Sequence, residues 1–242
     1  MNMKYKDKEK MDFIPDIVYE DNHLLVIIKP HNIGVQEDES KDDDLLNLLK
    51  QYIKVRDNKP GNVFLGLVHR LDRPTGGVMV FAKTSKCASR LAEQLKNHEM
   101  KKAYLCVVLG RPVQEKARLN CYLVKDSKTN TVNLATKSDY GAKQAILDYQ
   151  VLDNAMDMSL IKVNLLTGRS HQIRVQMSKQ NNTVICGDFK YGDKAHKCDL
   201  ALWAYQLQFN HPITKNPMIF KVLPDVEKLP WKLFENTISK ID

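Results

Sequence analysis

The chain has 242 residues, and 43% of them are hydrophobic, which is enough for a sizeable core within one large domain. Lysine and arginine outnumber aspartate and glutamate by 37 to 29, so the formal net charge of +8 favours a polyanionic partner such as a nucleic acid. Apolar runs such as residues 24–28 and 103–109 fall far short of the roughly 18 residues that would span a bilayer, which excludes a membrane-spanning helix.

The N-terminal part of the chain begins with a polar, lysine-rich segment and continues with alternating apolar and polar stretches. Residues 1–12 are expected to form a disordered tail rather than a signal or an anchor. Residues 17–20 and 24–28 read as two strands joined by a tight turn. Aspartates then precede apolar residues at helical spacing, which predicts a helix over about residues 44–55.

The middle of the chain carries a polar, glycine-containing loop between two apolar runs. Strands are predicted over residues 63–68 and 78–82, which places the loop of residues 69–77 between them. Ser85 is expected to cap the helix that follows. A buried strand is then predicted over residues 104–109.

Strands predominate from residue 117 onward. Residues 117–166 alternate apolar stretches with polar turns near 126–128, 139–141 and 153–154, which predicts successive antiparallel strands. Because strands come in runs rather than in strict alternation with helices, the fold class is α+β, with a large mixed or mainly antiparallel sheet and flanking helices.

The last third of the chain adds one helix, one strand and a terminal segment. Ser170 is predicted to cap a helix that runs from His171 to about Lys179. A strand follows around residues 200–209, and an amphipathic segment begins at Val226.

The five cysteines are widely spaced and include no Cys-x-x-Cys pair, which fits a reduced, cytoplasmic compartment. Cys186, His196 and Cys198 are of metal-binding type, but their irregular spacing matches no zinc motif. They are therefore interpreted as ordinary core and loop residues, and no metal or cofactor is expected.

Several short motifs follow one another along the chain. Residues 68–77 read Val-His-Arg-Leu-Asp-Arg-Pro-Thr-Gly-Gly, and residues 167–174 read Thr-Gly-Arg-Ser-His-Gln-Ile-Arg. The shorter motifs are Lys29-Pro30 with Gly34, Lys102-Ala103-Tyr104, Gly187-Asp188 with Tyr191-Gly192, and Phe209 with His211-Pro212. In this order they resemble the motifs of RNA pseudouridine synthases of the RluA type. The resemblance covers residues 17 to about 222.

The resemblance implies a pseudouridine-synthase fold with a central active-site cleft and a single catalytic domain over residues 13–242, expected to be a monomer. Its substrate would be a uridine in structured ribosomal or transfer RNA, which is extruded and rejoined to the ribose through C5. About sixteen residues precede the first predicted strand, too few for an RNA-binding domain of the S4 type. The family commonly has serine where Gly76 stands, so this loop is expected to be more mobile.

Asp72 is the residue that the resemblance makes the catalytic carboxylate. Arg70 and Arg73 lie close to it in sequence, and a nearby cation favours the ionised form that a nucleophile or base needs. Its residue type and position alone would also fit a loop aspartate that accepts turn amides or forms a surface ion pair. Whether the carboxylate attacks the anomeric carbon, attacks the base or removes a ribose proton stays open.

Tyr104 and Arg174 complete the predicted catalytic set. Tyr104, taken alone, reads as an aromatic core residue, but the resemblance places it against the target uracil, where it could assist proton transfer at C5. Arg174, taken alone, could contact phosphate or carry a solvated charge on its helix. The resemblance makes it the arginine that pairs with Asp72 and keeps it ionised.

The remaining site predictions concern RNA binding. The resemblance implies that Arg70 enters the base stack that the extruded uridine leaves, and the alternative is a phosphate contact. Arg73 is placed beside the RNA, and His69 is expected to order the loop near it. Arg169 is either an RNA contact or a structural residue, and His171 lies at the start of the predicted helix, where an anion would be stabilised.

Two other functions compete with catalysis. A non-catalytic RNA-binding or assembly protein of the same fold would not need Asp72, but it would need charge at Arg70 and its neighbours. A metal-dependent hydrolase would need a ligand set that the sequence does not offer.

Overall fold

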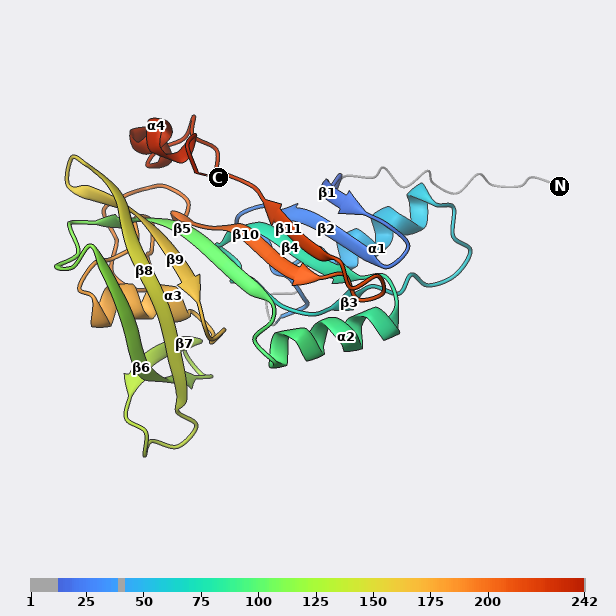
Figure 1. Ribbon diagram of the computed structural model, residues 1–242, viewed down its shortest axis with the longest axis horizontal. Coiled ribbons are helices and arrows are strands. Elements are labelled where there is room, and N and C mark those ends of the chain that lie inside the picture. Colours follow the sequence, from blue (N-terminus) through green and yellow to red (C-terminus); the bar gives the residue numbers. More distant parts are fainter. Residues whose placement is uncertain (1–12, 39–41, 242) are drawn as a thin grey trace.

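The computed structural model describes residues 13–38 and 42–241, so the tail expected over residues 1–12 lies outside the described residues. Within these residues, eleven strands form one sheet, in the order β1-β2-β4-β10-β5-β9-β8-β6-β7, with β11 beside β10 and β3 beside β4 (Figure 1). All pairs are antiparallel except β4 with β10, which confirms the α+β class and the mixed, mainly antiparallel sheet. No helix in the described part of the chain has the length and apolar character needed to cross a membrane.

The strands are β1 (Asp16–Glu20), β2 (Leu24–Lys29), β3 (Gly66–Leu67), β4 (Gly76–Ala82), β5 (Lys101–Leu109), β6 (Lys116–Asp126), β7 (Thr131–Ala135), β8 (Lys143–Ala155), β9 (Met158–Leu165), β10 (Leu202–Asn210) and β11 (Pro217–Lys221). The helices are α1 (Leu45–Arg56), α2 (Ser85–Lys96), α3 (Gln172–Val175), a π-helix (Gln176–Gln180), a 3-10 helix (Trp231–Phe234) and α4 (Glu235–Ile238). The sequence therefore predicted most elements, including the helix that Asp44 caps.

Three local predictions were wrong, and one strand was missed. The run at 63–68 forms only the two-residue strand β3, and Thr84, not Ser85, caps α2 by accepting the Cys87 amide. A turn was expected near Asp153, but Asp153 lies inside β8, next to a bulge in that strand. The chain turns after β8 instead, at Met156, which has a positive φ of 53°. Strand β11 was not predicted at all.

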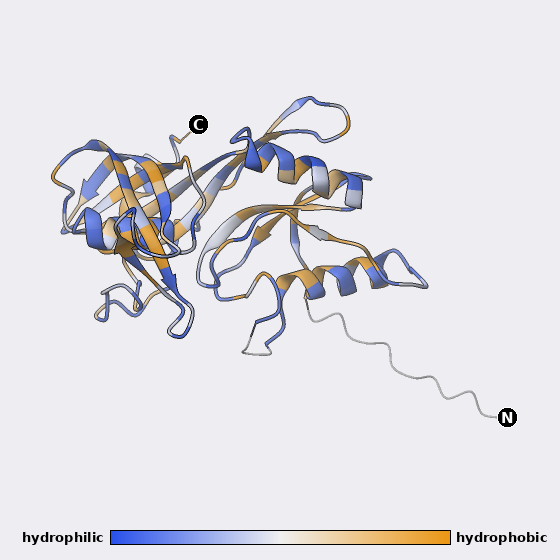
Figure 2. Cartoon of the chain, turned by 90° about the horizontal axis from the view of Figure 1, so that it is seen from below, coloured by the Kyte–Doolittle hydropathy of each residue, from blue (hydrophilic) through white to orange (hydrophobic). Residues whose placement is uncertain are grey.

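Two helices cover opposite faces of one half of the sheet. Alternate side chains of β2 and β4 point to opposite sides, so Leu25 and Phe81 pack in the same cluster as Leu49 of α1. Val26 packs in a second cluster with Leu91 of α2. Figure 2 shows the outer surfaces of these helices as mainly hydrophilic and the strands between them as mainly hydrophobic. In Figure 1 the other half, built from β6 to β9 with α3, lies at the opposite end of the molecule.

The parallel contact between β4 and β10 is unusually close. Gly76 lies opposite Trp203, and a Cβ added to Gly76 would lie 2.4 Å from the indole ring. Gly77 has a φ of 123°, and a Cβ there would lie 2.3 Å from the Ala204 carbonyl oxygen. The serine that the family commonly has at the position of Gly76 would therefore collide with Trp203. The sequence interpretation placed Gly76 in the loop, but in the structure Gly76 is the first residue of the buried strand β4.

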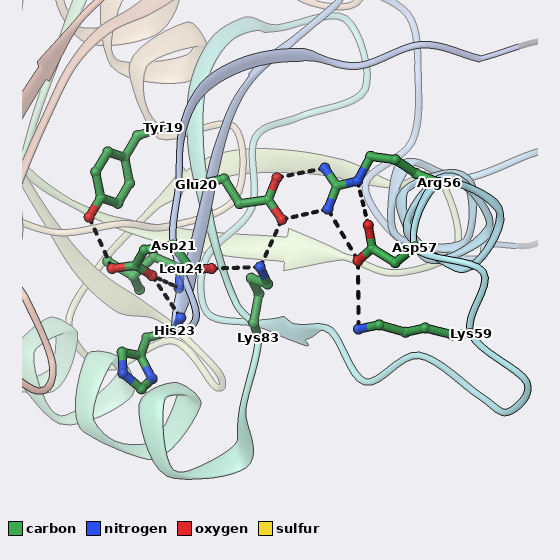
Figure 3. Close-up of polar contacts among 9 residues, drawn as sticks. All are labelled: Tyr19, Glu20, Asp21, His23, Leu24, Arg56, Asp57, Lys59 and Lys83. Carbon is green, nitrogen blue, oxygen red and sulfur yellow. Dashed lines mark hydrogen bonds and ion pairs between the residues drawn. The ribbon is translucent and has the colours of Figure 1, made fainter.

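A network of charged side chains ties β1 to α1 and to the end of β4 (Figure 3). Glu20 accepts hydrogen bonds from Arg56 at 2.6 and 2.8 Å and from Lys83 at 2.7 Å. The Arg56 hydrogen bonds, followed by those of Lys83 and against the effect of burial, lower the pKa of Glu20. The Glu20 side chain is 18% exposed, so solvent screens the network only in part.

Replacing Glu20 with glutamine should lower the free energy of unfolding by about 1 kcal/mol at neutral pH. Because the pKa of Glu20 is lower in the folded protein, the stability it contributes is complete above its ordinary pKa of 4.5 and is lost as pH falls through the folded value. Urea unfolding of wild type and variant at neutral and acidic pH measures this, with Glu115→Gln on an exposed residue as control. An equal loss at both pH values would contradict the assignment.

Candidate active site

A cleft of about 490 Å³ opens where three segments meet. The loop before β4 contributes Asp72, β5 contributes Tyr104, and the segment from β9 into α3 contributes Arg169 and Arg174. The three residues predicted to be catalytic thus line one cleft, although they are far apart in sequence.

Arg174 is 5% exposed and is held by two carboxylates. Its Nε and one terminal nitrogen donate to the two oxygens of Asp188 at 2.8 and 2.6 Å. The other terminal nitrogen lies 3.6 Å from Oδ2 of Asp72. Burial alone would lower the pKa of Arg174, but the hydrogen bonds and charge of Asp188, and then the charge of Asp72, leave this pKa raised. Arg174 is therefore a permanent cation beside Asp72.

The helix that carries Arg174 begins differently from the prediction. Ser170 does not cap it, because His171 precedes α3 with a left-handed φ of 50° and no side-chain cap is present. The Oε1 of Gln172 instead accepts the Arg169 amide at 3.0 Å and the Thr167 hydroxyl at 2.8 Å. The α-helix is only four residues long before it continues as a π-helix, so an anion site at its N-terminus is not supported.

Tyr191 supports the same corner of the cleft. The guanidinium of Arg174 lies 5.0 Å from the centroid of its ring. Its hydroxyl accepts the Val132 amide at 2.9 Å and lies 2.6 Å from Nδ1 of His171. His171, expected among the RNA-binding residues, lines the cleft while its ring is tied to Tyr191.

A buried lysine holds the loop that carries Asp72. The Nζ of Lys29 donates to the carbonyl oxygens of Pro30, Arg73 and Thr75 at 2.8, 2.9 and 2.8 Å. Burial lowers the pKa of Lys29 to about 7, and the Asp72 carboxylate opposes this shift. Three carbonyl acceptors match the three N–H donors of the ammonium form. The part of the loop that follows Asp72 is thereby fastened to the end of β2.

His69 orders the loop from the inside. It is 7% exposed, and its Nε2 accepts the Val80 amide at 3.2 Å. Burial, followed by the charge of Lys102, lowers the pKa of His69 to about 3, so the ring is neutral. Its position fits the expected role in loop order, but leaves little surface for the RNA contact predicted with it.

Tyr104 and Lys102 lie two residues apart on β5, so they share the face of the strand that lines the cleft. Tyr104 is 6% exposed. Burial, and then the charge of Asp72, raises the pKa of Tyr104, which keeps the phenol neutral. Burial lowers the pKa of Lys102.

The arginines predicted to bind RNA have different surroundings. Arg70 and Arg169 are exposed and line the cleft. Arg70 donates a hydrogen bond to the Gln36 side chain at 3.2 Å, and Arg169 donates to the Gln144 carbonyl at 2.8 Å. Arg73 does not line the cleft. It pairs with Asp38 at 3.0 Å and Asp42 at 2.7 Å, which offsets its charge.

The sequence interpretation missed Asp188, Lys29 and Lys102 as site residues. Each belongs to a quoted motif, so the signal was present, but their roles depend on contacts with distant segments. Asp188 holds Arg174, Lys29 fastens the loop, and Lys102 adds a cation to the cleft.

Replacing Lys29 with methionine should lower the free energy of unfolding by about 3 kcal/mol, because three carbonyl groups lose their common donor. Turnover should fall as well, since the loop around Asp72 would loosen. Urea unfolding and activity assays test this against Lys101→Met, an exposed lysine that donates to the single His98 carbonyl. Equal effects of the two substitutions would exclude the positioning role.

Known proteins resemble this chain over most of its length. Residues 23–179 match the model of the RNA pseudouridylate synthase family. A ribosomal large subunit pseudouridine synthase D from Zymomonas mobilis is 33% identical over 238 residues, which cover 93% of this chain and 74% of the relative. A ribosomal large subunit pseudouridine synthase C from Haemophilus ducreyi is 32% identical, over 84% of this chain and 63% of the relative.

The solved structure titled human RNA pseudouridylate synthase domain containing 4 superposes with a TM-score of 0.74 over 93% of both chains, at 23% identity, and so shares the fold. The family match spans well over half of the chain and includes Asp72, Tyr104 and Arg174. The chain therefore belongs to the RNA pseudouridylate synthase family and is an RNA-modifying isomerase.

Proposed function

We propose that this enzyme converts a uridine of large-subunit ribosomal RNA into pseudouridine, with Asp72 as the catalytic carboxylate. The observation that carries the proposal is that Asp72, Tyr104 and Arg174 line one cleft whose lining also includes the exposed cations Arg70 and Arg169. The choice of ribosomal RNA comes from the names of the curated relatives, which are ribosomal large subunit synthases.

Asp72 is suited to act as an anion. Arg174 lies 3.6 Å from it and is itself fastened by Asp188, so the positive charge stays beside the carboxylate. The Asp72 side chain is 26% exposed, which leaves it accessible to a substrate in the cleft. Breaking the bond from ribose to N1 requires one such carboxylate, and its attack on the ribose, its attack on the base and proton removal from the ribose all use this anion.

Tyr104 is suited to the uracil ring. Its own ring lines the cleft, and its phenol is held neutral, so it can donate a hydrogen bond or pass a proton at C5 without carrying a charge into the pocket. A flat aromatic side chain also offers a stacking surface to an extruded base.

The exposed cations are suited to RNA. A target base must leave the stack before it can reach Asp72, at a cost of a few kcal/mol. Arg70 and Arg169 both line the cleft. The guanidinium of Arg70 can occupy the vacated stack, and that of Arg169 can contact a phosphate.

Replacing Asp72 with asparagine should reduce pseudouridine formation by at least roughly 10³-fold, because the shape stays and the reacting charge is lost. The measurement is carbodiimide mapping of pseudouridine in total RNA from cells that lack the gene and carry either wild type or variant. RNA binding by the purified variant, measured by filter retention, should change little.

Asp16→Asn, on an exposed residue outside the cleft, is the matched control and should restore the modified site. Restoration by Asp72→Asn would refute the catalytic role and favour an RNA-binding or assembly protein. A restored site in transfer RNA rather than in large-subunit ribosomal RNA would refute the proposed substrate and leave the chemistry intact.

Replacing Arg174 with lysine should lower kcat by about 100-fold, because an ammonium cannot bind Asp188 through two parallel hydrogen bonds and still reach Asp72. Arg118→Lys is the control, since Arg118 forms the same two-bond pair with Asp148 at 2.7 and 2.8 Å on the exposed surface. Single-turnover kinetics on substrate RNA give the comparison. Similar rates for both variants would show that the orientation of Arg174 is unimportant.

A further inference from the structure

Lys102 contributes a partly buried cation to the wall of the cleft. It lies on β5, which runs between β9 and β10 in the middle of the sheet (Figure 1). Its partner across the β9 ladder is Leu165, which also lines the cleft. Among the residues that the structure describes, none forms a hydrogen bond or an ion pair with the Lys102 ammonium, and its Nζ is not closed off from solvent.

The other cations buried around this cleft are paired. Lys29 donates to three carbonyl oxygens, and Arg174 binds Asp188 through two hydrogen bonds. Burial lowers the pKa of Lys102, and no carboxylate in the described part of the chain opposes this shift. A partly buried ammonium without a counter-ion destabilises the folded protein. Its presence in a cleft is explained if a ligand supplies the missing anion.

The surroundings of the ammonium leave room for such a ligand. Gly168 has no side chain, and a Cβ added there would lie 3.3 Å from Nζ of Lys102. The charge of Lys102 also lowers the pKa of His69, in the loop that carries Asp72. Tyr104 lies two residues along the same face of β5, at a Cα separation of roughly 7 Å. The ammonium is therefore close to Gly168, to the loop and to the predicted uracil site.

The charges along the cleft suit a polyanion. The described residues that line it include one carboxylate, Asp72, and five lysines and arginines, which are Arg70, Lys96, Lys102, Arg169 and Arg174. Three of these cations are exposed, and Arg174 is already occupied by Asp188 and Asp72. Lys102 is thus the cation within the cleft wall whose charge is left for a substrate.

We propose that the Lys102 ammonium binds a phosphate that adjoins the target uridine. This inference rests on the proposed function, because it takes the extruded uracil to lie against Tyr104. Base and phosphate of one nucleotide are separated by the ribose, and Tyr104 and Lys102 are separated by one residue of β5, so both ends of the nucleotide are held at once. The three N–H donors of the ammonium suit phosphate oxygens, and the contact positions the RNA without reading its sequence.

Replacing Lys102 with methionine first tests whether its charge serves the fold. Because the ammonium has no partner to lose, the variant should unfold at the same or a higher urea concentration than wild type. Lys101→Met, on the adjacent exposed lysine outside the cleft lining, is the matched control. A clear fall in the urea midpoint of Lys102→Met alone would assign Lys102 a structural role and overturn the proposal.

The phosphate contact is measured by fluorescence anisotropy with a short single-stranded RNA that contains one central uridine. Lys102→Met should weaken binding by about 10-fold, and the slope of log Kd against log salt concentration should fall by about 1, because one phosphate contact is lost. Lys101→Met should change neither quantity. An unchanged salt slope in Lys102→Met would exclude the contact.

A neutral methylphosphonate linkage on either side of the uridine identifies the phosphate. The comparison RNA carries deoxyribose at the same place and an ordinary phosphate. On one side the neutral linkage should weaken binding to wild type by about 10-fold and have little effect on Lys102→Met, because both changes remove the same contact. Equal losses for the two proteins at both linkages would overturn the proposal.

These binding measurements involve no turnover. Their failure would therefore leave the catalytic role of Asp72 standing. Retained turnover in Asp72→Asn would in turn refute that role without changing the binding result for Lys102.

Discussion

The buried guanidinium of Arg174 is the contact on which the active cleft depends. A charge that is 5% exposed must be paired, and removal of one partner from such a pair costs several kcal/mol. Asp188 supplies two hydrogen bonds, and Tyr191 adds its ring below the guanidinium. The third nitrogen faces Asp72, so the requirement to neutralise a buried cation also determines where the Asp72 carboxylate lies.

The sheet determines the position of the loop that carries Asp72. Gly76 and Gly77 allow β4 to lie against Trp203 and Ala204 of β10, the one parallel pair among the described strands. Lys29 then fastens the preceding loop from β2. The loop 186–199 completes the arrangement, because it brings Asp188 to Arg174 and is itself held by the hydrogen bond from the Gly187 amide to Asp193. Three distant segments thus position one carboxylate.

Local patterns predicted the elements well where neighbouring residues decide the structure. Asp44 before a helical apolar pattern marked α1, and polar turns marked most of the strands between 117 and 166. The prediction was wrong where a tertiary contact competes with a local preference. No side chain caps α3 as expected of Ser170; Gln172 instead holds the preceding turn, because its Oε1 accepts the Arg169 amide and its Nε2 donates to the Ile146 carbonyl at 3.1 Å. Strand β11 forms only because β10 offers a partner.

The sequence by itself determined the family resemblance and the order of its motifs, and through this resemblance it led to the choice of Asp72, Tyr104 and Arg174, because the motifs can be recognised from residue types alone. The tertiary structure decided which residues support them. Lys29 lies 44 residues from one of its carbonyl partners in the loop and 46 residues from the other. The lack of a side chain at Gly76 is explained only by the contact with Trp203. Spacing along the chain does not predict such contacts, because they form only when strands far apart in sequence pair and bury a charge between them.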